Sequence, residues 1–179
     1  MALLKIARLG NPKIRHGAKL VSLDELQSPD IQKFIQDLVD TMRDVHGVGI
    51  AAPQVHVSKQ VIAIEVSPDN PRYPDQLAVP LTVLVNPKIV EHVEETESGW
   101  EGCLSVPDLR GRVPRWTRVK VQALDRHGQE LEFDAQGFYA RVIQHEVDHL
   151  QGQVFLDRLS DLRTLTYFCL LYTSAAADE

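Results

Sequence analysis

The chain has 179 residues and a formal net charge of −6, with 44% hydrophobic and 25% charged residues. This length suits one domain with a sizeable core, and the composition is that of an ordinary globular protein. The acidic balance argues against a phosphate-binding surface, although it leaves room for a local basic patch. No apolar run approaches the ~20 residues that span a bilayer, which argues against a membrane protein.

The cysteines and the first residues indicate the compartment. Cys103 and Cys169 are too few for the disulfide framework of a small secreted protein. The N-terminus lacks the apolar core of a secretory signal, and Gly10 and Pro12 would break the amphipathic helix of a transit peptide. We therefore expect a cytoplasmic protein.

The first long element expected is a helix that starts at Ser28-Pro29-Asp30, which supply a capping hydroxyl, a first-turn proline and an acid. Apolar residues then recur every three or four positions as far as Val45, and Gly47 ends the helix. Five β-like runs follow, at 60–66, 81–87, 88–95, 118–125 and 129–135. The turn at 126–128 joins the last two runs as a hairpin.

From Gly137 to about Leu150 the pattern becomes helical again, with apolar residues around most of the cylinder, which is typical of a buried helix. Strands between helices, without β-α-β alternation, indicate the α+β class. We expect mixed or antiparallel β-sheets packed around this buried central helix, together with an N-terminal and a C-terminal helix.

The buried helix carries the pattern H-E-x-x-H. His145 and His149 lie on one helix face about 5–6 Å apart at Cβ, close enough to share a cation. Glu146 is turned by about 100° and lies beside such a cation, where a carboxylate can take a proton from water and return it to a leaving group. The alternative is two helix histidines with an incidental glutamate, but the complete pattern favours a metal site.

A hydrolytic metal site needs a third protein ligand. In the extended metzincin pattern, H-E-x-x-H-x-x-G-x-x-H, the last position is occupied here by Phe155, which cannot bind a metal. The only glutamate after Glu146 is Glu179, and a solvated loop or a helix cap explains Asp157 and Asp161 better. The third ligand is therefore expected upstream.

Cys103, within WEGCLSVP (100–107), is the natural third ligand. It follows a β-like run and precedes a Ser-Val-Pro turn, where a thiolate is fixed and partly exposed. A lone intracellular cysteine is more often a small buried hydrophobe, so the pairing with H-E-x-x-H carries the assignment. The remaining histidines lie in a turn or lack a partner at ligand spacing, and we expect surface roles for them: His16, His46, His56, His92 and His127.

GVGIAAPQV (47–55) lacks the glycine and lysine pattern of a phosphate-binding loop. Its small residues allow the backbone to approach another strand or a peptide ligand closely. Gln54 offers a side-chain amide that can donate a hydrogen bond to a developing oxyanion.

Three stretches together closely resemble the motifs of the peptide deformylase family, in the family's order and spacing: GVGIAAPQ (47–54), EGCLS (101–105) and HEVDH (145–149). RLGNPKIR and RVKVQALDRHG are also similar to that family, so the resemblance covers about residues 3 to 165. It implies a single catalytic domain over 1–170, followed by a tail at 171–179. It further implies a metallohydrolase that removes the formyl group from N-formylmethionine of newly made polypeptides and releases formate.

The resemblance also implies residue roles. The cysteine and the two histidines named above hold the metal, and Glu146 is general base and then general acid. The backbone N–H of Leu104 and the side chain of Gln54 stabilise the oxyanion. Gly49 pairs its backbone with the substrate as an added strand.

The methionine side chain needs an apolar pocket. Val48 and Ile50 are candidates by motif position, and Phe138 and Val142 by helix face. For all four residues the alternative is an ordinary place in the core.

A thiolate with two imidazoles accepts Fe(II), Zn(II), Ni(II) or Co(II). The resemblance implies one divalent ion, with Fe(II) as the native metal and the others as substitutes in purified protein. It also implies nascent N-formylmethionyl peptides as partners and a transient contact with the ribosome, although the acidic end of the chain is poorly suited to ribosomal RNA. We expect a monomer.

Two other functions are compatible with parts of the pattern. A zincin-like metallopeptidase shares H-E-x-x-H, but its downstream ligand is missing. An inactive metal-binding relative would keep the ligands without needing Glu146 or Gln54, and both residues are present.

Overall fold

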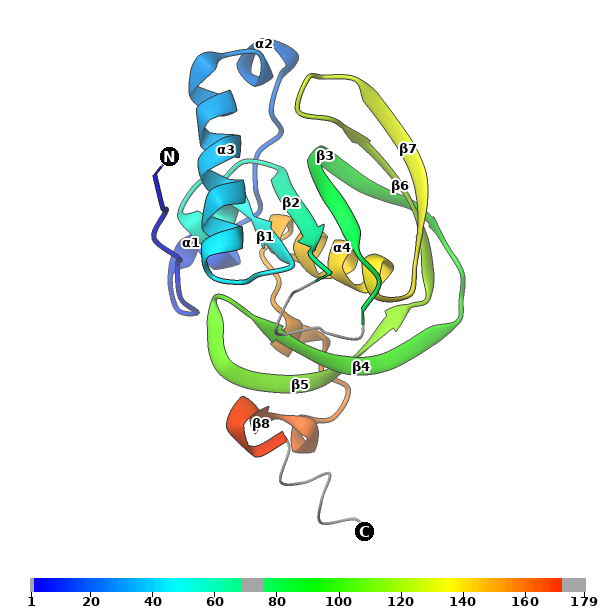
Figure 1. Ribbon diagram of the computed structural model, residues 1–179. Coiled ribbons are helices and arrows are strands. Elements are labelled where there is room, and N and C mark those ends of the chain that lie inside the picture. Colours follow the sequence, from blue (N-terminus) through cyan, green and yellow to red (C-terminus); the bar gives the residue numbers. More distant parts are fainter. Residues whose placement is uncertain (1, 69–75, 172–179) are drawn as a thin grey trace.

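Two long helices cover opposite faces of a five-stranded antiparallel sheet in the computed structural model, which describes residues 2–68 and 76–171 (Figure 1). The sheet has the order β1-β2-β3-β6-β7, formed by Gly49–Ala51, Val61–Val66, Val79–His92, Arg118–Leu124 and Glu130–Gln136. A second antiparallel sheet has the order β4-β5-β8, formed by Thr96–Cys103, Val106–Trp116 and Thr166–Tyr167. The predicted α+β class with antiparallel sheets is confirmed.

The described chain has two long α-helices and several short helical turns. α3 spans Pro29–Asp44 and α4 spans Gly137–Leu150, and single turns form α1 (Pro12–Arg15) and α2 (Leu23–Leu26). Four 3₁₀ turns complete the described helices: η1 to η4 at Ala52–Val55, Phe155–Arg158, Leu162–Thr164 and Phe168–Leu170. Among the described helices, none is long and apolar enough to cross a membrane.

The alternation of side chains in β2 explains how both long helices are held. Val61 and Ala63 belong to the core cluster beneath α3, whereas Ile62 and Ile64 belong to the cluster that packs against α4. Because successive strand residues point to opposite faces, a strand covered on both faces is a continuous apolar run. α4 is buried over most of its length, which places its polar residues inside the molecule.

The capping of α3 follows the predicted start but not the predicted end. The Ser28 hydroxyl accepts a hydrogen bond from the Ile31 N–H at 3.3 Å. At the other end, His46 takes the left-handed conformation, with φ of 53°, and the Gly47 N–H donates to the Met42 carbonyl at 2.9 Å. The helix therefore closes through His46, and Gly47 leads into the strand that follows.

Two expectations from the sequence differ from the structure. The runs 81–87 and 88–95 fall on the single strand β3, which ends at His92. Its pairing with β6 shifts in register across Asn86, whose φ is 53°, and again after Ile89. The expected C-terminal helix is replaced, as far as Leu170, by 3₁₀ turns and by β8, which pairs with β5. Residues 172–179 of the expected tail lie outside the described residues.

Candidate metal centre and active site

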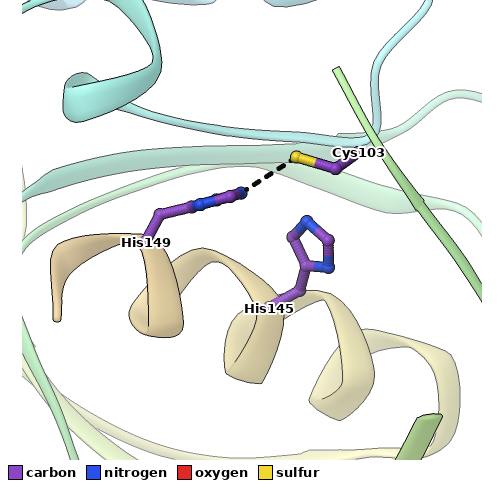
Figure 2. A group of neighbouring side chains, drawn as sticks. All are labelled: Cys103, His145 and His149. Carbon is purple, nitrogen blue, oxygen red and sulfur yellow. Dashed lines mark hydrogen bonds between the residues drawn. The ribbon is translucent and has the colours of Figure 1, made fainter. Parts of the chain in front are cut away.

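The site is assembled where the end of β4 faces the last turns of α4. Cys103 is the last residue of β4, and the ligand atoms of Cys103, His145 and His149 all lie within 4.8 Å of one another. Figure 2 shows the thiol and both imidazoles directed toward one point, with 3.3 Å between Cys103 Sγ and His149 Nε2. The two imidazole rings are 4.9 Å apart at their centroids and nearly perpendicular, at 80°.

The chemistry of this donor set fits a divalent metal. The ligand-forming atoms are one sulfur and two nitrogens, all from buried residues. Burial opposes ionisation of the Cys103 thiol, but the imidazoles of His149 and His145 outweigh this effect and hold its pKa well below the usual range. A thiolate with two imidazoles is a ligand set for zinc, iron, nickel or cobalt.

Glu101 orients one of the histidines. Its Oε2 lies 2.9 Å from Nδ1 of His145, so Nδ1 donates to the carboxylate and Nε2 is left to face the other two ligands. Burial opposes the charge on Glu101, but the hydrogen bonds from His145 and Arg115 outweigh it and lower its pKa below the usual range. The carboxylate is therefore ionised in the folded protein.

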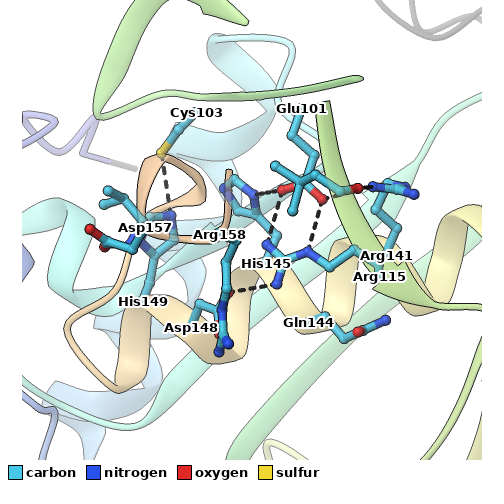
Figure 3. A network of polar contacts seen from close by, with 12 residues as sticks. Glu101, Cys103, Arg115, Arg141, Gln144, His145, Asp148, His149, Asp157 and Arg158 are labelled. Atoms are coloured by element: carbon cyan, nitrogen blue, oxygen red, sulfur yellow. Dashed lines mark hydrogen bonds and ion pairs between the residues drawn. The ribbon is translucent and has the colours of Figure 1, made fainter. Parts of the chain in front are cut away.

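An ion network, largely buried but with Arg158 exposed, extends from this carboxylate (Figure 3). Arg115 donates to both oxygens of Glu101, at 2.9 and 3.0 Å, and to Asp148 at 2.6 Å. Arg141 also donates to Glu101, at 3.0 Å, and Arg158 donates to Asp148 at 2.7 Å. The network joins β4, β5, α4 and η2, and thereby fixes the two elements that carry the ligands.

Among the described acids of the site, Glu146 alone has no neutralising partner in this network. It is buried, and its Oε2 has no hydrogen-bond partner within the described part of the chain. Burial raises the pKa of this carboxyl group to about 7, and the negative charges of Cys103 and Glu101 act in the same direction. The carboxyl group lies beside the ligands and has a pKa suited to exchanging protons near neutral pH.

Gly49 leaves the space that Glu146 fills. A Cβ added at Gly49 would overlap the carboxylate, with Cγ and Cδ of Glu146 only 2.9 Å away. The Glu65 N–H donates to the Val48 carbonyl, so strand alternation turns the backbone N–H and C=O of Gly49 away from β2. Because β1 is an edge strand, these groups face the open side of the sheet.

Gln54 and Leu104 lie on the cleft beside the ligands. The Ala51 N–H donates to Oε1 of Gln54 at 2.8 Å, which turns the amide nitrogen toward Cys103 Sγ and Ser105 Oγ, each at 3.4 Å. The amide is therefore held with its donor toward the site.

Three of the four apolar pocket candidates line the same cleft: Val48, Phe138 and Val142. Ile50 does not, because its side chain is fully buried in the core cluster beneath α3. Its neighbour Gly49 faces the cleft, and strand alternation turns Ile50 to the other side. We therefore correct the expected pocket by removing Ile50. Trp100 also lines the cleft and was not a candidate.

The sequence reasoning assigned no role to the ion network. Glu101 lies two positions before Cys103 in one strand, and residues i and i+2 share a strand face, so this neighbour of the ligand was open to prediction. The contact between Arg115 and Glu101 could not be predicted, because it depends on how β4 pairs with β5. In this pairing Arg115 lies opposite Glu97, so even the register does not reveal its contact with Glu101.

Three comparisons with known proteins give the same family. A family model described as polypeptide deformylase matches residues 3–164. The chain is 46% identical over 179 residues to peptide deformylase 1 of Prochlorococcus marinus, covering 100% of this chain and 92% of that protein. It is 42% identical over 167 residues to peptide deformylase 1 of Nitrosomonas europaea, covering 93% of each. A Met-Ala-Ser-bound class I type b peptide deformylase from Acinetobacter baumannii has a TM-score of 0.85 at 45% identity, covering 88% of this chain and 99% of that one.

Proposed function

The chain belongs to the polypeptide deformylase family, and we propose how its residues divide the family's reaction among them. The protein is a metal-dependent hydrolase that removes the N-formyl group from N-formylmethionine peptides. One observation carries the proposed roles: a buried carboxylate with an unpaired oxygen lies next to a cluster of one thiol and two imidazoles. We assign this reaction to one catalytic domain over residues 1–170.

Cys103, His145 and His149 would hold the metal, since they form the candidate cluster. When bound there, a divalent cation supplies Lewis acidity, which lowers the pKa of water and polarises a carbonyl group. We propose Fe(II) as the native metal, because the family resemblance points to it and the donor set accepts it, with Zn(II), Ni(II) and Co(II) as substitutes. Glu101 orients His145 for this task from its other nitrogen.

Glu146 moves the proton. As general base its carboxylate removes a proton from the attacking water, and as general acid it returns this proton to the departing amine nitrogen. The unpaired Oε2 and the pKa of about 7 support this role, since the group can carry or release a proton near neutral pH.

The oxyanion of the tetrahedral intermediate needs donors that are already in place. We assign them to the backbone N–H of Leu104 and the side-chain amide of Gln54. The fixed orientation of the Gln54 amide supports this assignment, because little reorganisation is needed as negative charge develops.

The peptide adds to the open edge of β1, with its backbone paired to Gly49. The methionine side chain enters the apolar part of the cleft, formed by Val48, Phe138 and Val142. The relative from Acinetobacter baumannii that was solved with Met-Ala-Ser bound supports a peptide that starts with methionine as the product here.

A zincin-like metallopeptidase is disfavoured by the structure as well as by the family. Phe155 occupies the position of the downstream ligand in the metzincin pattern and is buried in a core cluster with Cys103. An inactive metal-binding relative is disfavoured by Glu146, whose Oε2 is buried without a hydrogen-bond partner among the described residues. Such burial costs free energy, and a role in catalysis accounts for its presence here.

The remaining proposals concern the setting of the reaction. We place the protein in the cytoplasm, where it meets nascent N-formylmethionyl peptides as a monomer. A transient contact with the ribosome through the last residues is disfavoured by their acidic character, since ribosomal RNA attracts lysine and arginine. We propose no direct binding of nucleic acid and no association with membranes.

The deciding experiment is formate release from an N-formyl-methionyl peptide by protein loaded with Fe(II) or Ni(II) without oxygen. We expect rapid release of formate while the same peptide without the formyl group stays intact. Cleavage of internal bonds in that control would indicate a metallopeptidase. No formate from fully metal-loaded protein would indicate an inactive relative.

A further inference from the structure

Residues 7–9 connect the two segments that carry the proposed oxyanion donors. The Ala7 N–H donates to the Gln54 carbonyl at 2.7 Å, and the Leu9 N–H donates to the Ser105 carbonyl at 2.8 Å. Gln54 lies in η1, and Ser105 lies between β4 and β5, some fifty residues along the chain. A short N-terminal segment therefore sets the spacing between two parts of the site that are distant in sequence.

Arg8, in the middle of this segment, contacts the donor residue itself. Its guanidinium donates to the carbonyl of Leu104 at 3.1 Å. The same peptide plane is held at its other edge, where the Ser105 N–H donates to Cys103 Sγ at 3.4 Å. With this plane fixed at both edges and Cys103 fixed as a ligand, little freedom remains for the preceding plane, which carries the Leu104 N–H.

We propose that Arg8 is a positioning residue that holds the Leu104–Ser105 peptide so that the Leu104 N–H points at the developing oxyanion. This inference rests on the proposed function, because it needs Leu104 to be an oxyanion donor. A charged donor suits the task, since its hydrogen bond to a carbonyl is stronger than that of a neutral donor. Arg8 touches no reacting atom and acts through Leu104 alone.

A competing role for Arg8 is direct contact with the peptide. Arg8 also lines a second hollow, together with Leu104, Pro107 and Arg110. A residue that binds the downstream peptide contributes equally to the ground state and the transition state, so its loss raises KM. A residue that orients an oxyanion donor contributes only in the transition state, so its loss lowers kcat.

The test compares Arg8→Met and Arg8→Lys with the control Arg15→Met. Arg15 lies in the same N-terminal part of the chain, is also partly exposed, and pairs with Asp157 away from the donors. We expect kcat of Arg8→Met to fall about tenfold with KM within about twofold of wild type, the scale of one hydrogen bond from a charged donor. Arg8→Lys keeps a cationic donor, so we expect its kcat to lie no more than about threefold below that of the wild type.

Inhibitor binding gives a second readout, independent of turnover. A methionyl hydroxamate places an oxygen where the substrate carbonyl oxygen would lie, whereas the matching thiol ligates the metal and lacks that oxygen. We expect Arg8→Met to weaken the hydroxamate by about the same factor as kcat and to leave the thiol unchanged. Metal content and melting temperature are measured for each variant.

Three results would overturn the proposal. These are an Arg8→Met variant indistinguishable from Arg15→Met, a loss confined to KM, and equal weakening of the hydroxamate and the thiol. If Arg8→Met fails to fold, Arg8→Lys decides, because a folded lysine variant with the full tenfold loss of kcat also contradicts the proposal. Failure of the proposed function is distinct, since the wild-type protein would then release no formate.

Discussion

At the scale of single residues, Glu146 is the group whose removal separates catalysis from metal binding. Glu146→Gln keeps the size of the side chain but cannot take up a proton, so we expect turnover to fall by roughly 10³-fold or more. The ligands are untouched, so the metal content should equal that of the wild type. Formate release and metal analysis on the same sample check both statements, and near-normal turnover would contradict the assigned role.

A substitution at Gly49 tests whether the close packing of the Glu146 carboxylate matters for catalysis. A methyl group at this position overlaps Glu146, so Gly49→Ala displaces the carboxylate or the backbone of β1. We expect a loss of kcat on the order of 10²-fold, since small misplacements of reacting groups have effects of that size. Gly17→Ala is the matched control, because its added Cβ meets only the Leu150 carbonyl, at 3.9 Å. Equal kinetics for the two variants would show that the close approach is unimportant.

A substitution at Glu101 tests whether this carboxylate orients His145 for metal binding. Glu101→Gln removes the charge that orients His145, and losses of such supporting groups typically weaken metal binding by about 10- to 100-fold. Competition with a chelator measures the change in the metal dissociation constant. Glu97→Gln, an exposed glutamate on the same strand, should bind metal like the wild type. A Glu101→Gln variant with unchanged metal affinity would leave the carboxylate with a structural role only.

Sequence reasoning reached the residues with unusual chemistry and missed those with ordinary chemistry. Cys103, His145 and His149 were predicted because few residue types bind soft metals, and their spacing on a helix is diagnostic. Arg8 and Arg115 carry common surface side chains, and only tertiary pairing brings them to the site. Ile50 was misplaced because a motif position does not reveal which face of a short strand a side chain takes.

At the scale of elements, periodicity predicted the long helices and the covered strands but not the β4–β5 hairpin. α3, β2, β6, β7 and α4 each carry a regular apolar pattern. β5 contains Pro107, Gly111 and Pro114, which by local rules argue against a strand. Its pairing with β4 overrides those preferences. Cys103 was therefore identified by its chemistry and by its place after a β-like run, without the hairpin that holds it.

The contact between α3 and β2 has a predictable pH dependence. Arg43 near the end of α3 donates to both oxygens of Glu65, at 2.6 and 2.8 Å, and these hydrogen bonds lower the pKa of Glu65 below its ordinary value of 4.5. A lowered pKa contributes stability above the unfolded-state value, and this contribution is lost as the pH falls through the folded-state value. The pair therefore stabilises the fold at neutral pH and ceases to do so in acid.

Glu65→Gln should accordingly reduce the free energy of unfolding by about 0.5–1 kcal/mol at pH 7, because the pair is partly exposed. The difference from wild type should shrink as the pH falls below 4.5. Urea titrations across this range measure it. Glu94→Gln, whose side chain is 96% exposed, is the control and should show little difference at any pH. A Glu65→Gln difference that stays constant or grows in acid would contradict the direction of the pKa shift.

At the scale of the whole molecule, the proposed metal would act as a cross-link between two parts of the fold. Cys103 ends a strand of the smaller sheet, and the two histidines lie on the helix packed against the larger one. Cys103 and His149 are 46 positions apart in sequence, so a metal held by both would join segments that the unfolded chain keeps apart. The buried ion network already ties the same elements, which holds the ligands near one another before a metal binds.

Metal binding should therefore raise the stability of the entire domain. A ligand that binds only the folded state, at a concentration a thousandfold above its dissociation constant, adds about 4 kcal/mol, which for a chain of this size is roughly 10 °C in melting temperature. Cys103→Ala removes the thiolate and should abolish most of this shift, whereas Cys169→Ala, at an exposed site, should retain it. Melting curves with saturating Ni(II) and with a chelator measure the shift in each variant. An equal shift in both variants would mean that the metal binds elsewhere, and the assignment of Cys103 as a ligand would fall with it.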